Sequence, residues 1–310
     1  SCAGINRVNK SVHIMELFST LSLQRDAHRS AILHVSLNRP SKRNAMNDLM
    51  FTEIGQVFRG AAADGALRVI VLHIDGCGGL DLIEASSAFD GDDASDAARN
   101  ALAIRSVGRR WQNALTALEK CGKVVIASIS GPCWGAGLEL ICAADIRWST
   151  RSSYFVAAEI DVGLAADVGG LQRFPRIVGN ESLVRELVFS GRRLSAVDAE
   201  RAGLLSGLFE SREALDAAAL ALAQRIAAKS PVALLGAKVL LNYARDHSVD
   251  DALEYAITWN AAMLQGVDMK QAAMAMLMKQ EAEFDELWGS EEGEQLDPLG
   301  VTGGAPAAKL

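Results

Sequence analysis

Residues 123–137 read Lys-Val-Val-Ile-Ala-Ser-Ile-Ser-Gly-Pro-Cys-Trp-Gly-Ala-Gly, a nearly continuous apolar run that ends in a glycine-rich turn. Such a run is typical of a strand that is buried on both faces of a parallel sheet. The small residues of the turn allow a ligand to approach the backbone closely. Residues 138–141 look like a helix start, whose free amides favour a nearby oxyanion. The segment therefore predicts a strand, a tight turn and a helix start that could bind a negative charge.

The segments before this one alternate between strand and helix patterns. Leu67–Ile74 repeats the pattern of a buried strand, and Ile32–Asn38 alternates apolar and polar residues as a half-exposed strand does. Helices are expected from Asn44, which can cap the first of them, and around Ile104–Leu118. Buried strands that alternate with amphipathic helices favour an α/β fold with largely parallel pairing.

The C-terminal third shows helix patterns, and no strand is expected after about residue 180. Ser211–Lys229 is rich in alanine and predicts a helix that ends before Pro231. Ser248 begins a capping box that opens a long helix, which could reach Phe284.

The two ends of the chain differ in composition from its middle. Residues 1–30 are expected to form an N-terminal extension, with a weak likeness to a transit segment. Residues 286–310 are expected to form a flexible tail, because they are acidic and then rich in glycine and alanine. The final Ala308-Lys309-Leu310 differs in one position from the Ser-Lys-Leu signal that a peroxisomal import receptor binds.

The composition argues against several classes of protein. The 31 basic and 38 acidic residues give a net charge of −7, which disfavours a nucleic-acid-binding protein. No segment approaches the roughly 18 uninterrupted apolar residues of a membrane span. The five cysteines form no Cys-x-x-Cys pair and the five histidines lack metal-ligand spacing. Neither a disulfide framework nor a metal site is therefore predicted.

Two common catalytic motifs are absent from the sequence. A dinucleotide-binding Gly-x-Gly-x-x-Gly motif would need glycine at Leu140, after Gly135-Ala136-Gly137. No Gly-x-Ser-x-Gly sequence occurs, so a serine hydrolase has no visible nucleophile. Neither a nicotinamide-dependent dehydrogenase nor a serine hydrolase is favoured.

Three carboxylates lie in apolar sequence close to glycine turns, and these are Glu139, Glu159 and Asp167. Burial would raise the pKa of such groups toward neutrality, as general acid–base catalysis requires. Glu159 and Asp167 would be about 26 Å apart on an extended chain, so they meet only if the segment between them folds back. The alternative is that these acids are exposed or form salt bridges.

Three motifs bear on the family of the chain. They are Asn-Arg-Pro-Ser-Lys-Arg-Asn-Ala at 38–45, the turn at 131–140, and Glu-Ile-Asp-Val-Gly-Leu-Ala-Ala-Asp-Val-Gly at 159–169. Together they resemble the crotonase (enoyl-CoA hydratase/isomerase) superfamily over about residues 31–280. The last motif, with Ser-Pro-Val-Ala at 230–233 and Arg-Asp-His-Ser-Val at 245–249, is most similar to the dienoyl-CoA isomerase branch.

The resemblance implies a fold and an assembly. It implies an α/β, crotonase-like spiral of ββα and βαβ turns over residues 31–205, followed by a helical trimerisation region at 206–285. We therefore expect a homotrimer or a homohexamer of two stacked trimers. The expected location is a peroxisome-type organelle, on the basis of Ala308-Lys309-Leu310, or the mitochondrial matrix.

The site residues of the family carry over position by position. By this resemblance the catalytic carboxylates are Glu159, Asp167 and Glu139, and the oxyanion-hole amides are those of Leu80 and Ala136. The acyl-CoA substrate is expected to contact a further set of residues, namely Lys42, Arg43, Ala45, Gly78, Gly79, Asp81 and Leu82. No cofactor is expected, since coenzyme A is part of the substrate.

The resemblance also implies a reaction, the isomerisation of 3,5-dienoyl-CoA to 2,4-dienoyl-CoA in fatty-acid β-oxidation. Glu159 and Asp167 would shift a proton between C2 and C6, while the two amides stabilise the dienolate of the thioester. The isomerase branch usually has aspartate where Glu139 stands, and glutamate there with Glu159 is the pair of the hydratases. Hydration of 2-enoyl-CoA is therefore an alternative, as is a catalytically silent CoA-binding protein of the same fold.

Overall fold

A mixed sheet forms the centre of the computed structural model, which describes residues 18–89 and 96–288. In this part of the chain the sheet has eight strands, in the order β1-β2-β3-β4-β5-β8, with β6 joined to β4 and β7. Their bounds are β1 Leu21–Arg25, β2 Ile32–Leu37, β3 Val69–Cys77, β4 Val124–Trp134, β5 Ile146–Thr150, β6 Tyr154–Val156, β7 Leu194–Ser195 and β8 Gly207–Phe209.

Parallel pairing dominates the sheet. Strands β2, β3, β4, β5 and β8 run parallel, β6 is parallel to β4, and the pairs β1–β2 and β6–β7 are antiparallel. This confirms the predicted α/β class with largely parallel strands. The register pairs Cys77 at the end of β3 with Cys133 near the end of β4. The loops that follow these two strands therefore begin at the same edge of the sheet.

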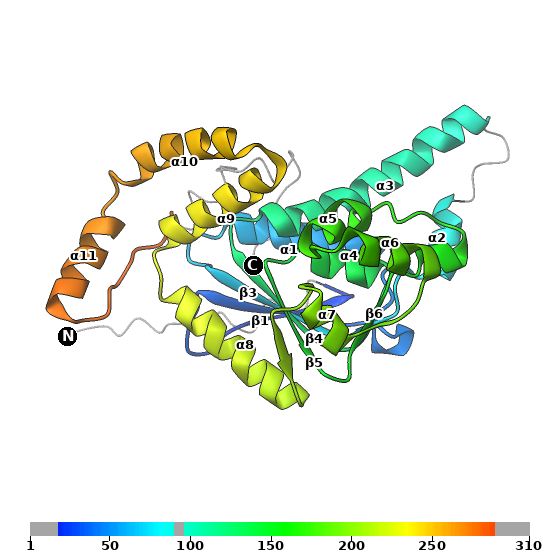
Figure 1. Ribbon diagram of the computed structural model, residues 1–310, viewed down its shortest axis with the longest axis horizontal. Coiled ribbons are helices and arrows are strands. Elements are labelled where there is room, and N and C mark those ends of the chain that lie inside the picture. Colours follow the sequence, from blue (N-terminus) through cyan, green and yellow to red (C-terminus); the bar gives the residue numbers. More distant parts are fainter. Residues whose placement is uncertain (1–17, 90–95, 289–310) are drawn as a thin grey trace, which may run out of the picture.

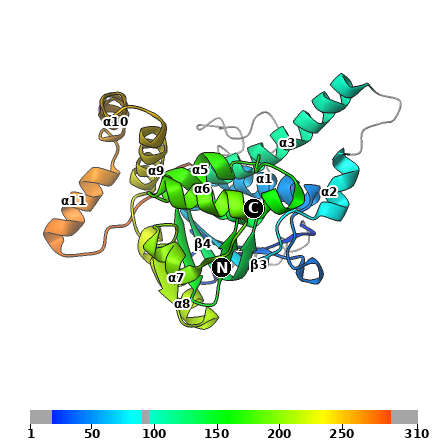
Figure 2. The ribbon, with the colours of Figure 1, turned by 45° about the vertical axis from the view of Figure 1, so that its right-hand side comes forward.

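Helices cover both faces of the sheet (Figures 1 and 2). One face carries α1 Asp48–Ala63, α3 Ala97–Lys120, α4 Ala136–Cys142, α5 Gly170–Ile177 and α6 Glu181–Ser190, and the opposite face carries α8 Arg212–Ala227. The shorter helices are α2 Leu82–Phe89, α7 Ala196–Arg201 and the 3₁₀ turns Pro40–Lys42 and Glu159–Val162. The loops that follow β3 and β4 lead from the sheet to helices α2 and α4.

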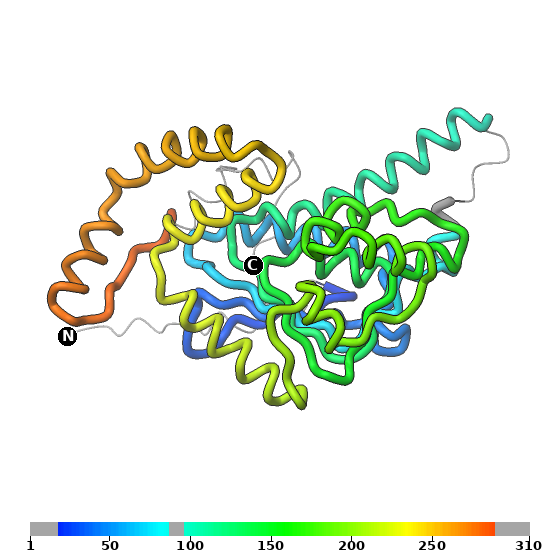
Figure 3. Tube along the Cα trace, viewed as in Figure 1, coloured from blue at the N-terminus to red at the C-terminus, as the bar shows by residue number. Residues whose placement is uncertain are grey.

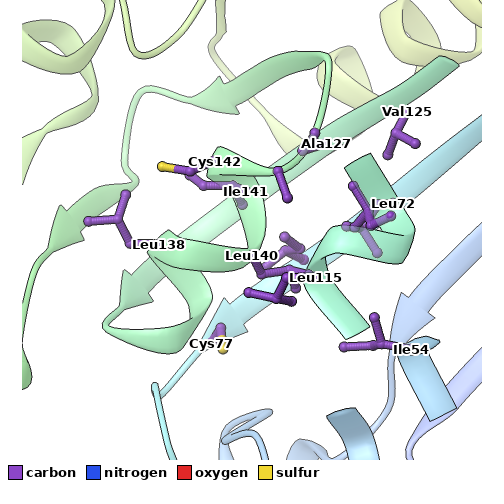
Figure 4. Packing of buried hydrophobic residues seen from close by; sticks show 14 of the residues in the cluster. Ile54, Leu72, Cys77, Leu115, Val125, Ala127, Leu138, Leu140, Ile141 and Cys142 are labelled. Atoms are coloured by element: carbon purple, nitrogen blue, oxygen red, sulfur yellow. The ribbon is translucent and has the colours of Figure 1, made fainter. Parts of the chain in front are cut away.

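Two apolar clusters hold these layers together. The larger lies between the sheet and the α1–α6 face, where Leu72 of β3, Val125 of β4, Leu115 of α3 and Leu140 of α4 pack together (Figure 4). The smaller cluster packs alanines of α8 against the other face of the sheet, and it includes Ala219, Ala223, Val69, Val71 and Ile126. Small side chains on one stripe of α8 allow this helix to lie close to the strands.

The C-terminal helices extend to one side of the core, as the tube in Figure 3 shows. They are α9 Pro231–Asp246, α10 Val249–Met263 and α11 Asp268–Met278. Within 18–89 and 96–288 no single helix combines the length and apolarity of a membrane span, and only α8 and α9, bent by 108°, meet those criteria as a pair.

The predicted cap of the first helix is wrong. Asn47, not Asn44, caps α1, because its Oδ1 accepts a hydrogen bond of 3.0 Å from the Met50 amide. Asn44 has a positive φ of 52°, and its Nδ2 donates to the carbonyl oxygens of Asp75 and Gly76 at 3.1 Å. Asn44 therefore attaches the 39–47 loop to the end of β3.

Two predictions about the C-terminal third are also wrong. Strands do occur after residue 180, since β7 pairs with β6 and β8 pairs with β5. These strands have two and three residues, too few for an alternating pattern to be recognised. The long helix expected from Ser248 to Phe284 divides into α10 and α11 around Gly266.

A histidine pair lies between the sheet and α8. The His34 Nδ1 and His73 Nε2 atoms are 3.0 Å apart, and His73 Nδ1 lies 3.3 Å from Asp216 Oδ1 of α8. Burial lowers the pKa of His34, and burial together with the proximity of His34 lowers the pKa of His73 to about 4. In the window between the ordinary value of 6.5 and about 4, the unfolded chain therefore binds a proton that folded His73 does not bind.

We predict that the protein becomes less stable as the pH is lowered, because His73 binds a proton in the unfolded chain but not in the folded one. Between pH 7 and pH 5 the contribution of His73 to the free energy of unfolding should fall by about 2 kcal/mol. His73→Gln should remove most of that pH dependence, whereas His28→Gln, at an exposed histidine, should keep it. Urea unfolding at both pH values measures the difference, and equal pH dependence in wild type and His73→Gln would contradict the prediction.

Candidate active site

A cavity of about 240 Å³ lies where β3 and β4 end, and side chains of α1 and α3 form part of its wall. Its apolar walls include Phe51, Trp111, Trp134 and Leu164, and its polar groups come from four carboxylates and two glycine-rich loops. The carboxylates are Glu139, Glu159, Asp161 and Asp167. An apolar pocket with a few convergent polar groups is the usual form of a site for a small molecule.

Two backbone amides border this cavity. Met46 donates to Gly79 O at 2.7 Å and accepts from the Asp81 amide at 2.8 Å, so the N–H of Leu80 points away from Met46. Ala136 is the first residue of α4, where an amide has no acceptor within the helix. Neither amide donates a hydrogen bond to another residue that the structure describes. Both N–H groups therefore lack an acceptor among the described residues, and their role as the oxyanion hole stays a prediction.

The turn before Ala136 brings a carboxylate close to these amides. Gly135 has a φ of 45°, and a Cβ atom at this position would lie 3.1 Å from Glu159 Oε1. The backbone dihedrals of Gly135, φ 45° and ψ −114°, favour glycine at this position, and the approach of Glu159 leaves little room for a side chain. The carboxylate of Glu159 therefore lies against the turn that presents the Ala136 amide.

Glu139 is a buried carboxyl group on α4, with an exposed fraction of 4%. Its Oε1 accepts a hydrogen bond of 2.7 Å from the Gly170 amide, and a Cβ on Gly170 would lie 2.7 Å from Glu139 Cγ. Burial and the negative charge of Glu159 raise the pKa of Glu139 to about 8, although the Gly170 amide acts in the opposite direction. Glu139 is therefore mainly protonated at pH 7.

The segment between Glu159 and Asp167 folds back, which is the condition for both acids to reach one site. After the 3₁₀ turn, Gly163 takes a φ of 75° and Leu164 N donates to Glu159 O at 3.0 Å. Burial and the charge of Asp167 raise the pKa of Glu159, whose buried Oε1 has no hydrogen-bond partner in the described part of the chain. Partial burial likewise raises the pKa of Asp167, which lines the cavity but is exposed in the single chain.

The structure thus brings Glu139, Glu159 and Asp167 to one cavity. Among residues 18–89 and 96–288 none of these carboxylates forms an ion pair. Glu139 is buried and Glu159 half-buried, so the alternative of exposed or salt-bridged acids fails for these two, whereas Asp167 is exposed as that alternative stated. Acids with raised pKa values at one site are suited to proton transfer near neutral pH.

The other predicted contacts occupy different positions. Gly78, Gly79 and Leu82 line the cavity. Asp81 does not, because its buried carboxylate pairs with Arg39 Nη1 at 3.1 Å.

Three predicted contacts lie in the 39–47 loop beside the cavity. Lys42 and Arg43 are exposed, and Ala45 is half-buried. The carbonyl oxygen of Arg43 accepts a hydrogen bond of 2.9 Å from the Gly78 amide.

Several cavity residues were not predicted from the sequence. Trp134 precedes the glycine turn directly, and this position could have indicated it. Phe51 and Trp111 stack with ring centroids 4.9 Å apart, a contact between α1 and α3 that no local pattern reports. A second, apolar cavity of about 150 Å³ shares Glu139 and Glu159 with the first and extends toward Phe189 of α6.

Comparison with known proteins identifies the family. The model of the enoyl-CoA hydratase/isomerase family matches residues 27–287. The chain is 43% identical to the mitochondrial Delta(3,5)-Delta(2,4)-dienoyl-CoA isomerase of Mus musculus, covering 84% of this chain and 80% of that protein. It is 37% identical to the peroxisomal isomerase of the same name from Arabidopsis thaliana, covering 88% and 99%.

Solved structures agree with this result. A putative enoyl-CoA hydratase from Streptomyces coelicolor A3(2) superposes with a TM-score of 0.78 at 28% identity, covering 91% of this chain and 99% of that one. A putative enoyl-CoA hydratase from Thermobifida fusca YX, solved with acetoacetyl-CoA, gives 0.68 at 27% identity over 79% and 95%.

The chain belongs to the enoyl-CoA hydratase/isomerase family and has the crotonase fold. The relatives at 43% and 37% identity carry the name of a dienoyl-CoA isomerase, which agrees with the prediction of an isomerase enzyme. One of these two relatives is named mitochondrial and the other peroxisomal, which matches the two locations predicted from the sequence. The individual roles of the site residues stay predictions.

We predict that the pKa of Glu139 depends on the charge of Glu159. Glu159→Gln removes the negative charge that raises the pKa of Glu139, so the pKa of Glu139 should fall below about 8. Asp161→Asn removes an exposed acid from the same 3₁₀ turn and should leave the titration of Glu139 unchanged. Carbon-13 NMR of labelled glutamate side chains measures both values. A pKa of Glu139 that stays the same in Glu159→Gln would contradict the proximity of the two carboxylates.

Proposed function

We propose that this protein isomerises 3,5-dienoyl-CoA to 2,4-dienoyl-CoA in fatty-acid β-oxidation. The observation that carries the proposal is a set of three carboxyl groups with raised pKa values around one cavity, beneath two available backbone amides. The names of the relatives from mouse and Arabidopsis support the same reaction. The reaction moves one proton and needs no cofactor beyond the coenzyme A that the substrate carries.

The amides of Leu80 and Ala136 would hold the thioester carbonyl oxygen. Removal of a proton from C2 places negative charge on this oxygen, and both N–H groups can donate to it. Loss of one such donor typically costs about 3–4 kcal/mol of transition-state stabilisation. Backbone donors suit this role because their positions are set by the strand ends rather than by side-chain rotamers.

We assign the proton at C2 to Glu159. C2 is the carbon next to the thioester carbonyl, and Glu159 Oε1 lies against the turn that carries the Ala136 amide. This oxygen is buried without a hydrogen-bond partner among the described residues, so it is not occupied by another donor. The C–H bond at C2 breaks, its electrons form the C1–C2 double bond of the enolate, and Glu159 takes the proton.

Asp167 would complete the shift at C6. It is an exposed residue that lines the same cavity as Glu159, beyond the Gly163 turn, and partial burial raises its pKa. The electrons of the extended enolate return from the oxygen along the chain, a new C–H bond forms at C6, and the double bonds become those of C2–C3 and C4–C5. Asp167 loses one proton as Glu159 gains one, so the step balances.

Hydration of 2-enoyl-CoA is a second candidate activity. It is favoured by the proximity of Glu139 and Glu159, since the charge of Glu159 contributes to the raised pKa of Glu139. A protonated and an ionised carboxyl group side by side could orient a water molecule for addition. Absence of turnover with either substrate would instead favour a silent CoA-binding protein.

The remaining parts of the substrate would lie along the loop before α1 and in the apolar space. Lys42 and Arg43 are exposed cations that could contact the phosphates, and the backbone of Ala45 could meet the adenine. The apolar cavity beyond Glu139 could take the tail of the acyl chain. The Thermobifida fusca neighbour, solved with acetoacetyl-CoA, supports an acyl-CoA ligand.

We also propose a homotrimer or homohexamer, built through the C-terminal helices. Large apolar side chains of α10 and α11 are exposed in the single chain, among them Leu253, Ile257, Met276 and Leu277 at 63–80%. Faces of this kind mark sites of protein contact. The location would be mitochondrial or peroxisomal, and the tripeptide Ala308-Lys309-Leu310 on which peroxisomal import would depend lies outside the described residues.

We predict that Asp167→Asn abolishes isomerisation but not hydration. An amide cannot deliver the proton to C6, so kcat with 3,5-octadienoyl-CoA should fall by about 10²-fold or more. Hydration of crotonyl-CoA, which would use Glu139 and Glu159, should change by less than about threefold, a difference below 1 kcal/mol. The ultraviolet absorbance of the conjugated thioester follows the first reaction. Retention of more than about a tenth of kcat would contradict the assignment.

A further inference from the structure

The loop that carries Asp167 is attached to α3 at two points. Gln112 Nε2 of α3 donates a hydrogen bond of 2.6 Å to the carbonyl oxygen of Asp167. Further along the chain, Arg173 of α5 donates to Glu119 Oε2 of α3 at 2.8 Å and to Thr116 Oγ1 at 3.3 Å. A single helix therefore holds both ends of residues 167–173.

The second attachment is a buried ion-pair network. The side chains of Arg173 and Glu119 are 11% and 7% exposed, and Glu119 also pairs with Arg245 of α9. Burial alone would raise the pKa of Glu119, but Arg173 and Arg245 hold it below its ordinary value. Gly169, with a φ of 121°, leaves the space that the Arg173 guanidinium occupies. The start of α5 is thus fixed relative to α3, and with it the Gly170 amide that binds Glu139.

The first attachment depends on a side chain that α3 holds in a defined direction. The adjacent Trp111 donates from Nε1 to Asp48 Oδ1 of α1 at 2.7 Å and stacks on Phe51. These contacts fix the rotation of α3 about its axis, so that Gln112 faces the loop. Residues 164 and 165 are exposed and Val168 is buried, so the Gln112 bond restrains the carbonyl oxygen of Asp167 where the chain passes from exposed to buried residues.

We propose that Gln112 is a positioning residue for proton delivery at C6. It would act through the backbone of Asp167, by setting how far the Asp167 carboxyl group lies from Glu159. This inference rests on the proposed isomerase function. It predicts that proton removal at C2 by Glu159, which is held by a different part of the chain, does not depend on Gln112.

The test compares two proton-transfer steps in the same enzyme. Gln112→Glu is nearly isosteric and loses the donor, and Gln112→Met loses the donor without adding a charge. Asn113→Asp is the matched control, since Asn113 is the exposed neighbour on α3 and its side chain makes no hydrogen bond to a described residue. Full-length enzyme is incubated with 3,5-octadienoyl-CoA in D₂O. Ultraviolet absorbance measures isomerisation, and mass spectrometry of the recovered substrate measures deuterium exchange at C2.

For both Gln112 variants we expect isomerisation to fall about tenfold, with exchange at C2 and KM within about twofold of wild type. Asn113→Asp should match wild type in both steps. Unchanged isomerisation in the Gln112 variants would overturn the inference, and so would an equal fall in both steps, which indicates a general loss of structure. A wild-type chain that exchanges at C2 without isomerising would overturn the proposed function itself.

Discussion

The parallel register of β3 and β4 is the constraint on which the site depends. Because Cys77 lies opposite Cys133, the loops Gly78–Leu80 and Gly135–Ala136 leave the sheet side by side. Gly137 has no side chain, and a Cβ there would lie 2.8 Å from the Cβ and Sγ of Cys77, so α4 can begin this close to β3 only with glycine. Strand pairing and one close contact of the backbone therefore place Leu80 and Ala136 at the same cavity.

The acids of the site differ electrostatically from two other buried acids of the chain. Glu119 lies between Arg173 and Arg245, and Asp81 pairs with Arg39. No such cation accompanies Glu139, Glu159 or Asp167 in the described part of the chain. A buried carboxylate without a counter-charge is costly, so these groups bind protons more readily and their pKa values rise. The missing counter-charge disfavours the carboxylate form and raises the pKa, and a raised pKa suits these acids to proton transfer near neutral pH.

Much of this arrangement could be predicted from the sequence because local patterns report burial. The apolar run at Val124–Ser130 identified β4, and the family motif pointed to Glu159 and Asp167. Other features depend on contacts between segments that are distant in the chain. Gln112 and Asp167 are 55 positions apart, and no periodicity of α3 distinguishes Gln112 from a solvent-facing residue. The short strand β8 and the break between α10 and α11 were missed for a related reason, since packing and not propensity decides such short elements.

The central claim is that Glu159 removes a proton from C2 and Asp167 delivers one to C6 of the same acyl chain. Two backbone amides meanwhile bind the thioester oxygen. The position of deuterium in the product tests it most directly. Wild-type enzyme is allowed to convert 3,5-octadienoyl-CoA in D₂O, and the 2,4-dienoyl product is examined by proton and deuterium NMR. The account predicts deuterium at C6 as the site of proton delivery, with none at C4. Deuterium at C4 would indicate a stepwise 1,3-shift served by one acid and would contradict the account.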